Sequence, residues 1–361
     1  MNSLALGKKQ VGLEHPTYFV ADISANHDGD LERAKLLIRL CAEAGADAAK
    51  FQNFRAPKIV SERGFNQLGS QLSHQRRWTK SVFQVYGEAT LPWEWTPILK
   101  TECEACGIEY FSAPYDLEAV DMLDPYVNLF KMGSGDITWP EMLRKVASKQ
   151  KPVLLATGAS DIEEVQRAVK EVLQINSRLV LMQCNTNYTA SMENFRHIHL
   201  RVLETYRTMF PTLVLGISDH TPGHATVLGA VALGARVIEK HFTDDNRRAG
   251  PDHPFSMTPF SWKDMVDRTR ELEYALGSSH KFVAKNEQET VVVQRRCLRA
   301  ARALQAGTLL TEEMLEALRP APREAVMPFD LPQVIGRRLL RDLQHGDHLT
   351  WESLAKGEGS E

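Results

Sequence analysis

Two histidines end two consecutive strand-like segments of the chain. His220 closes the first segment and His241 closes the second, and the stretch 223–234 between them has the length of a helix. A parallel β-α-β unit would therefore bring both imidazoles to the same edge of a sheet, within reach of one divalent metal. Glu239 stands two residues before His241, so its carboxylate leaves the strand on the same face. The combination predicts the metal site of an enzyme.

Two imidazole nitrogens leave the other positions of a metal's coordination shell to water or substrate oxygens. Such an open site is typical of a catalytic metal rather than of a closed structural zinc. Mixed nitrogen and oxygen ligands favour Mn2+, with Mg2+, Co2+ and Zn2+ as alternatives. We expect the metal to act as a Lewis acid on a substrate carbonyl. Two buried histidines, each satisfied within the core, are the alternative interpretation.

Two lysines and a glycine-rich turn predict a site for an anion. Lys50 and Lys131 each stand near the end of a strand-like run, and Gly133-Ser134-Gly135 follows the second run directly. Ammonium groups and the N–H groups of a turn without bulky side chains suit a phosphate or a carboxylate. A Schiff-base lysine, or surface lysines beside an ordinary tight turn, are the alternatives.

Over the first ~280 residues, short apolar runs typical of strands alternate with amphipathic stretches whose apolar residues have the 3.6-residue spacing of helices, as in α/β proteins. Eight short apolar runs predict strands: 18–24, 47–52, 108–113, 127–132, 152–156, 179–184, 213–218 and 236–241. Stretches with helical spacing lie between them, for example 30–44, 116–124, 160–174, 193–208 and 260–276. Eight such units predict a closed (β/α)8 TIM barrel, with an open doubly wound sheet as the alternative. Polar residues follow nearly every run, at the face where barrel enzymes place their chemistry.

Composition argues against several other classes of protein. The net charge of −3, without a long basic run, argues against nucleic-acid binding. No apolar stretch approaches the ~18 residues of a membrane span, and the first residues lack a signal peptide's apolar core. Five cysteines are too few for a disulfide framework, which favours a reducing cytoplasm. We interpret the lone C-x-x-C pair, Cys103 and Cys106, as packing residues.

The composition changes near residue 280, where a polar and charged stretch begins. Short hydrophobic pieces separated by turn signals follow, which is typical of a small β-rich domain. We therefore expect a catalytic barrel domain at 1–280, a linker at 281–293 and a small β-rich domain at 294–361.

Several motifs, in this order, resemble the sialic acid synthase family, the phosphoenolpyruvate-dependent synthases of nine-carbon 2-keto acids. The matching stretches of the barrel are ADISANHDGDLERAK, AGADAAKFQ, FKMGSGD, LLATGAS, QCNTNY, GISDHTPG and ALGARVIEKHFTDDNRRAGPDH. In the tail, LQAGTLLTEEMLEALRP and VIGRRLLRDLQHGDHLTWE are similar to that family's antifreeze-like (SAF) domain. The resemblance covers roughly residues 15–355 and implies a TIM barrel followed by an SAF domain.

The resemblance also implies the reaction of a transferase. The C3 carbon of phosphoenolpyruvate attacks the open-chain aldehyde of an N-acetylated hexosamine, N-acetylmannosamine or a related sugar. Water adds at C2, and phosphate leaves by cleavage of a C–O bond. The product is a nine-carbon 2-keto acid of the N-acetylneuraminate type.

Each family role is carried over to a residue that matches the family's motif. The resemblance implies His220 and His241 as ligands of Mn2+, and Glu239 and Asp22 as catalytic carboxylates. For phosphoenolpyruvate it implies Lys50, Lys131, Ser134, Ser218 and Thr186. For the sugar it implies Gln52, Tyr188, Asp252 and Arg319. Because Arg319 matches an arginine that reaches the partner subunit's active site in this family, a domain-swapped homodimer is implied as well.

The chain departs from the family pattern at several positions. Asp22 replaces a glutamate and is shorter by one methylene, Gln183 replaces a histidine, and Thr186 replaces an asparagine. The 60–95 region differs most, and we expect its aromatic residues to form part of the sugar entrance. These residues are Trp78, Tyr86, Trp93 and Trp95. The departures bear on the identity of the sugar more than on the reaction.

Three alternatives to a synthase of N-acetylneuraminate remain open. A legionaminate or pseudaminate synthase would use a 2,4-diacetamido sugar with the same chemistry. A metal-dependent aldolase would use the metal without phosphoenolpyruvate. A barrel that has lost catalysis would be a glycan-binding protein, although the retained lysines, histidines and Glu239 argue against that loss.

Overall fold

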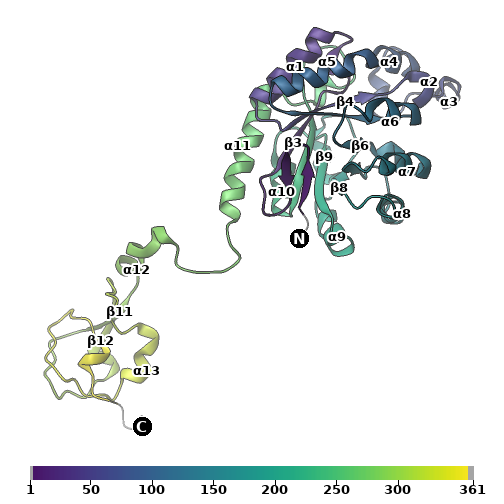
Figure 1. Ribbon diagram of the computed structural model, residues 1–361. Coiled ribbons are helices and arrows are strands. Elements are labelled where there is room, and N and C mark those ends of the chain that lie inside the picture. Colours follow the sequence, from purple (N-terminus) through teal and green to yellow (C-terminus); the bar gives the residue numbers. More distant parts are fainter. Residues whose placement is uncertain (1–2, 357–361) are drawn as a thin grey trace. The chain divides into compact units, whose positions relative to one another are not determined.

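The computed structural model of the protein describes residues 3–356 (Figure 1). Its contacts divide the chain into two compact units, Met1–Gly277 and Ser278–Glu361. The first unit is a parallel barrel, and the second is a small unit with its own hydrophobic core. Each unit is described below by itself.

Eight parallel strands close the barrel of the first unit. They are β3 (Tyr18–Asp22), β4 (Ala48–Asn53), β5 (Glu109–Pro114), β6 (Phe130–Met132), β7 (Val153–Ala156), β8 (Leu179–Cys184), β9 (Val214–Asp219) and β10 (Ala235–His241). The last strand, β10, pairs in parallel with both β9 and β3, and this pairing closes the cylinder. Each predicted run overlaps one strand, so the (β/α)8 prediction is confirmed and the open-sheet alternative is wrong.

Helices surround the cylinder and bury its outer face (Figure 1). They are α1 (Leu31–Glu43), α5 (Thr96–Ala105), α6 (Leu117–Leu123), α7 (Pro140–Ser148), α8 (Ile162–Leu173), α9 (Val202–Met209), α10 (Ala225–Ala232) and α11 (Pro259–Leu276). Local sequence explains their starts: Asp161 and Glu164 form a capping box at α8, and Thr258 caps α11 ahead of Pro259. Apolar residues on one side of each helix then pack on the strands.

Irregular segments follow several strands and carry part of the cavity described below. The segment between β4 and α5 holds α2 (Ala56–Ile59), α3 (Glu62–Gln67), η2 (Ser73–Arg77), α4 (Val82–Glu88) and η3 (Trp93–Trp95). Single-turn 3-10 helices occur elsewhere as η1 (Ser24–His27), η4 (Ser134–Asp136), η5 (Met192–His197) and η6 (His253–Phe255). An antiparallel hairpin, β1 (Leu4–Leu6) and β2 (Lys9–Val11), precedes the barrel and buries Leu6 and Val11 in its core.

The sequence-based helix at 193–208 is wrong in its first half. Residues Met192–His197 form the 3-10 segment η5, and α9 begins only at Val202. His199 between them has a φ of 49°. A residue in the left-handed region cannot continue a right-handed helix, so the two segments are separate.

The second unit matches the expected small domain of short, irregular strands. Its elements are η7 (Lys285–Glu287), α12 (Gln288–Gln294), β11 (Cys297–Ala300), η8 (Glu312–Met314), β12 (Leu315–Leu318), η9 (Pro328–Asp330), α13 (Leu331–Val334) and η10 (Trp351–Ser353). Strands β11 and β12 pair antiparallel, and isolated bridges join other parts of the unit. Ten buried apolar residues, among them Leu298, Val326 and Leu349, form its core.

Two further expectations concern cysteines and membranes. All five cysteines are free, and Cys103 is buried in the barrel core, as a packing residue would be. Among the helices of residues 3–356, none combines the length and the apolar character that crossing a membrane requires.

Candidate active site

A cavity of about 650 Å³ opens at the carboxyl ends of the barrel strands. Every predicted site residue of the barrel lines it: Asp22, Lys50, Gln52, Lys131, Ser134, Thr186, Tyr188, Ser218, His220, Glu239, His241 and Asp252. The remaining predicted residue, Arg319, is exposed and belongs to the second unit. The structure therefore brings together twelve side chains that the sequence distributes over 231 positions, from 22 to 252.

The pairing of β10 with its neighbours explains why these side chains converge. Glu239 lies beside Ser218 of β9, and His241 lies beside Asp22 of β3. Since alternate residues of a strand face opposite sides, Glu239 and His241 both face the cavity. Lys240 between them lies on the other side, where its ammonium group donates to the carboxylate of Asp219.

Four buried charges form the base of the cavity. The Nζ of Lys50 lies 2.8 Å from Asp22 Oδ2 and 3.2 Å from Glu239 Oε1. The Nζ of Lys131 lies 3.4 Å from the same Glu239 oxygen. Their side chains are between 2% and 4% exposed, so each charge depends on the others for compensation.

This arrangement shifts the pKa values of the charged groups. Burial works against the charge of Lys50, but the carboxylates of Asp22 and Glu239 outweigh it and raise the pKa. Burial lowers the pKa of Lys131, and the negative charge of Glu239 offsets only part of this effect. Burial would raise the pKa of Glu239, but Lys131 and Lys50 lower it to about 2. Glu239 is therefore an ionised carboxylate at neutral pH.

The oxygens of Glu239 have different surroundings. Oε1 accepts hydrogen bonds from Lys50 and from Ser218, whose Oγ is 3.0 Å away. Oε2 is buried and has no partner among the described residues. One oxygen thus fixes the carboxylate in place, and the other can accept a proton or a hydrogen bond from a bound molecule.

A narrow cradle lies next to Lys131. The N–H group of Gly158 donates to Ser134 Oγ at 2.9 Å. A Cβ atom at Gly158 would come within 2.5 Å of Thr186 Cγ2 and 3.0 Å of Ser134 Oγ. A side chain at this position would displace its neighbours, so glycine lets Ser134, Cys184 and Thr186 pack directly on the backbone at the edge of the cavity.

The two histidine rings lie with their centroids 5.3 Å apart. His220 Nδ1 is 2.8 Å from the carbonyl oxygen of Asn185. Burial, and then the electrostatic influence of the neighbouring His241 ring, lower the pKa of His220 to about 3, so the His220 ring is neutral. A neutral ring that donates from Nδ1 to a carbonyl keeps a lone pair on Nε2.

The surroundings of the histidines fit a divalent metal. His241 Nδ1 is buried and has no hydrogen-bond partner among the described residues. His241 Nε2 lies 3.4 Å from Asp22 Oδ2, so a carboxylate stands beside the imidazole pair. Within residues 3–356, no group of three or more His, Cys, Asp and Glu side chains has the geometry of a complete metal site. The two imidazoles could therefore supply only part of the coordination shell of a metal.

The predicted sugar-binding residues surround the histidines. Asp252 Oδ2 accepts a hydrogen bond from Ser24 Oγ and lies 3.9 Å from His241 Nδ1. Gln52 Nε2 donates to Asp22 Oδ2 at 3.0 Å. The centroid of the Tyr188 ring lies 4.3 Å from the centroid of the His220 ring. Polar groups able to contact hydroxyls therefore stand within a few ångströms of the imidazoles.

A series of rings, which we call the aromatic wall, lines another part of the cavity. It consists of Phe54, His74, Trp78, Tyr86 and Tyr115. Phe54 lies 5.3 Å from Tyr86 and 5.9 Å from Tyr115, and His74 lies 5.4 Å from Trp78, between ring centroids. These spacings are typical of packed aromatic pairs.

Two of the four aromatic residues that were expected at a sugar entrance lie at the cavity. Trp78 and Tyr86 line the cavity. Trp93 instead packs under the guanidinium group of Arg55, at 4.6 Å, and Trp95 packs against the barrel core and His27. The last two residues therefore support the segment that carries the wall.

The sequence-based analysis missed several cavity residues. Phe54, His74 and Tyr115 of the wall were not predicted, because the segments that carry them have no periodic pattern. Asp136 lines the cavity too, and burial raises its pKa to about 6. Its position in a polar turn directly after a strand could have indicated it.

Two departures from the family pattern have different structural settings. Gln183 is buried, and its Nε2 donates to the carbonyl of Ile198 at 2.9 Å, so it holds the segment after η5. Thr186 faces the cavity beside Gly158. The first departure concerns the scaffold, and the second concerns the cradle next to Lys131.

Comparison with known proteins agrees with this geometry. Residues 37–281 match the NeuB family, and residues 295–355 match the SAF domain. An N,N'-diacetyllegionaminic acid synthase of Legionella pneumophila is 33% identical, over 96% of this chain and 97% of the relative. An N-acetylneuraminate-9-phosphate synthase of Homo sapiens is 32% identical, over 95% of this chain and 94% of the relative.

A solved structure of an N-acetylneuraminic acid (sialic acid) synthetase from Leptospira borgpetersenii, in complex with citrate, has the same fold. It superposes with a TM-score of 0.71 at 26% identity, and the match covers 80% of this chain and 95% of that chain. The family match spans most of the barrel, and the relatives match almost the whole chain. The chain therefore belongs to the NeuB family of nonulosonic acid synthases, as an enzyme with a C-terminal SAF domain.

Proposed function

We propose that the protein condenses phosphoenolpyruvate with the open-chain form of an N-acetylated hexosamine, N-acetylmannosamine or a related sugar, and releases phosphate. The product is a nine-carbon 2-keto sugar acid of the N-acetylneuraminate type. One observation carries the proposal: the anion-binding lysines and the imidazole pair open into one cavity and share a carboxylate. Asp22 contacts both Lys50 and His241.

Phosphoenolpyruvate binds, in this proposal, at the end of the cavity that holds the lysines. Lys50 and Lys131 supply two ammonium groups, and Ser134, Ser218 and Thr186 supply hydroxyls. In the free protein, Glu239 is the anionic partner of both lysines. The carboxylate and phosphate of the substrate can take over this pairing, since charge-assisted hydrogen bonds to Lys are among the stronger polar contacts.

His220 and His241 would hold Mn2+, with Mg2+ or Co2+ as alternatives. The neutral state of His220 and the unpartnered Nδ1 of His241 support this assignment. When bound, the metal supplies Lewis-acid polarisation of the sugar's aldehyde oxygen.

The bond changes follow from the two substrates. C3 of phosphoenolpyruvate forms a C–C bond with the aldehyde carbon, and the aldehyde oxygen takes up a proton. Water adds to C2 and loses a proton, and the C2–O bond to phosphate then breaks. We assign the proton from water to Glu239, because its Oε2 is a buried, ionised acceptor without a partner. Asp22 holds Lys50 and Gln52 in place beside it.

Gln52, Tyr188 and Asp252 contact the sugar and its hydroxyls in this proposal. Their position around the imidazole pair supports the assignment. Arg319 of the partner subunit recognises the acylamino group, within a domain-swapped homodimer of the cytoplasm. The support for this part is the exposed position of that arginine in the SAF domain and the family resemblance of its surroundings.

A 2,4-diacetamido sugar, as used by a legionaminate synthase, is the second candidate for the acceptor. The aromatic wall favours it, because rings in the cavity pack well against acetamido and methyl groups. The comparisons support the shared reaction rather than one sugar, because the legionaminic acid synthase is 33% identical and the N-acetylneuraminate-9-phosphate synthase is 32% identical. Both candidate functions use the same reaction, so the sugar that the protein accepts distinguishes them.

Phosphate release tests the proposal. The protein is incubated with phosphoenolpyruvate, Mn2+ and one sugar at a time: N-acetylmannosamine, its 6-phosphate, or a 2,4-diacetamido hexose. We expect phosphate only when all three components are present, together with a product whose mass equals both substrates plus water minus phosphoric acid. Phosphate release without sugar, or turnover without phosphoenolpyruvate, would contradict the synthase assignment.

A further inference from the structure

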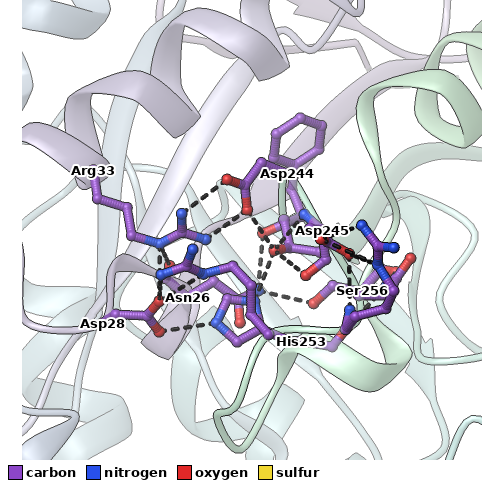
Figure 2. A network of polar contacts seen from close by, with 12 residues as sticks. Asn26, Asp28, Arg33, Asp244, Asp245, His253 and Ser256 are labelled. Atoms are coloured by element: carbon purple, nitrogen blue, oxygen red, sulfur yellow. Dashed lines mark hydrogen bonds and ion pairs between the residues drawn. The ribbon is translucent and has the colours of Figure 1, made fainter.

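A polar network outside the cavity joins the segment after β10 to the segment after β3 (Figure 2). We call residues 244–256 the β10–α11 loop, which carries the proposed sugar ligand Asp252. Arg33 of α1 donates to both oxygens of Asp244 at 2.6 and 2.8 Å. Arg248 of the loop donates to Asp28 at 2.7 Å. One arginine–aspartate pair therefore links this loop to α1, and the other links it to the connection between β3 and α1.

His253 lies at the centre of this network and has no exposed surface. Its Nε2 is 2.8 Å from Asp28 Oδ1, and its Nδ1 is 2.7 Å from Thr243 Oγ1. A carboxylate only accepts, so Nε2–H is the donor to Asp28. The ring thereby connects the first β-α connection, the end of β10 and its own loop.

The backbone around the ring is closely packed. A Cβ atom at Gly250 would lie 2.7 Å from Cδ2 of His253. Asn246 donates from one Nδ2 to the carbonyls of His253 and Ser256. A ring that meets backbone on one side and two fixed partners at its nitrogens has little freedom to rotate.

Asp252 and His253 are neighbours that face opposite ways. The Asp252 side chain lines the cavity and accepts from Ser24, whereas His253 does not line it. The Asp252 carbonyl accepts from Ser256 Oγ at 2.7 Å. A change at His253 can therefore reach a bound sugar only by moving the backbone that carries Asp252.

We propose that His253 is a positioning residue for the sugar: by bridging Asp28 and Thr243 it fixes the β10–α11 loop so that the Asp252 carboxylate meets the sugar's hydroxyls. The inference rests on the proposed function, which gives Asp252 its sugar contact. Displacement of a binding group by about 1 Å can reduce activity by about 10²-fold, so a fixed backbone here has a direct effect on turnover.

Two substitutions separate the bonds of the ring. In His253→Asn the amide reaches only as far as Nδ1 of the imidazole and keeps the contact with Thr243. In His253→Gln the longer chain carries its NH2 group to the position of Nε2 and keeps the contact with Asp28. If the bridge to Asp28 positions the loop, the glutamine variant retains sugar affinity that the asparagine variant loses.

Steady-state kinetics with phosphoenolpyruvate, Mn2+ and the best sugar of the panel test the inference. We expect His253→Asn to raise the KM for the sugar about tenfold, the effect of one lost hydrogen bond to a charged group, with an unchanged KM for phosphoenolpyruvate. His253→Gln should recover most of the loss. Asp28→Asn should raise the same KM, and the two changes together should raise it by less than the product of their separate effects, because they remove one shared bond. Arg247→Ala, which removes only an exposed ion pair with Asp245, is the matched control.

Equal KM values for the sugar in wild type and His253→Asn, or an equal rise for both substrates, would overturn the inference. If His253→Asn fails to fold, Asp28→Asn is compared with Arg248→Ala, because Asp28 also pairs with Arg248 and Arg33. Only a rise in the sugar's KM beyond that of Arg248→Ala then belongs to the bond with His253, and an equal rise would overturn the inference. Crystal structures of His253→Asn and Asp28→Asn without substrate give a readout independent of turnover. In both, the hydrogen bond from Ser24 Oγ to the Asp252 carboxylate should be lost. If wild type turns over no sugar, the function proposal fails, and these structures still decide whether His253 positions the loop.

Discussion

The base of the cavity and its aromatic wall are built in different ways. The base consists of Asp22, Lys50, Lys131 and Glu239, which stand on strands whose pairing sets their spacing. The wall stands mostly on the β4–α5 segment, whose helices are only four to seven residues long. Strand residues are held by hydrogen bonds to two neighbouring strands, while the wall is held by contacts between its rings.

We propose that this contrast separates the reaction from the choice of sugar. The base offers fixed charges, which suit the phosphate and the proton transfers that every synthase of this family requires. The wall offers apolar rings, whose identity can change without disturbing the barrel. Substitutions in the base should therefore lower turnover, and substitutions in the wall should alter affinity for the sugar.

Loss of a metal ligand should have the largest effect. We expect His241→Ala to lower kcat/KM by about 10³-fold, because Lewis-acid activation contributes several kcal/mol. Chelator treatment of wild type should cause a similar loss, reversed by Mn2+. His280→Ala, at an exposed position, is the control. Wild-type rates in chelator-treated His241→Ala would refute the metal assignment.

Removal of a buried lysine should come next. Lys131→Met should raise the KM for phosphoenolpyruvate about 100-fold and leave that for the sugar within about twofold, since one charge-assisted contact is lost. Lys170→Met on the exposed face of α8 controls for the loss of a positive charge. If the KM for the sugar changes as much as the KM for phosphoenolpyruvate, the two substrates do not occupy separate parts of the cavity.

Arg319 tests whether another subunit completes the wall. Arg319→Ala should raise the KM for the sugar about tenfold and leave that for phosphoenolpyruvate unchanged, as expected for one hydrogen bond to an acylamino group from a charged donor. Arg323→Ala, also exposed in the same unit, is the control. Parallel changes in both KM values would contradict the domain-swapped arrangement.

A truncation in the wall should have a smaller effect on affinity and a visible effect on selectivity. Tyr86→Ala removes a ring that packs 5.3 Å from Phe54 and 6.5 Å from Trp78. We expect the KM for the preferred sugar to rise about fivefold, with kcat nearly unchanged, from the loss of aromatic contact. Tyr86→Phe separates the ring from its hydroxyl. A fall in kcat without a change in KM would mean that the wall takes part in the reaction.

The shortened acid of the base should show the smallest effect. In Asp22→Glu the added methylene pushes the carboxylate past Lys50, Gln52 and His241, which all meet Oδ2 in the native protein. We expect kcat/KM to fall about threefold, since the charge is kept next to the same three partners. A new sugar preference in this variant would show that the base, and not only the wall, selects the sugar.

The base could be predicted from the sequence because strands have a simple rule. A period of two places Glu239 and His241 on one face, and parallel pairing brings the ends of successive strands together. The eight strands were found because each lies in a short segment rich in apolar residues that is bounded by polar residues or glycine. The lysines and His220 followed from their place at the ends of such runs.

The wall and the positioning network could not be predicted, because they depend on contacts between distant segments without periodicity. His74 meets Trp78 only after η2 has turned the chain, and His253 meets Asp28 across 225 positions. The hairpin β1–β2 was missed because each of its strands is three residues long. The break at His199 depends on a single backbone angle that its residue type does not require.

The alternation along β10 also limits how this enzyme can change. Deleting one residue from the strand would turn Lys240 toward the cavity and move Glu239 or His241 to the opposite side. There the displaced side chain would lie beside the Asp219 carboxylate, which pairs with Lys240 in the native protein. The site would then carry three ammonium groups and lose its acceptor for protons. A register change at the end that carries Glu239 and His241 would therefore remove the site, whereas β10 already pairs irregularly with β9 between Ala235 and Val237. We expect new specificities in descendants of this protein to arise in the connections between the elements rather than at this end of the strand.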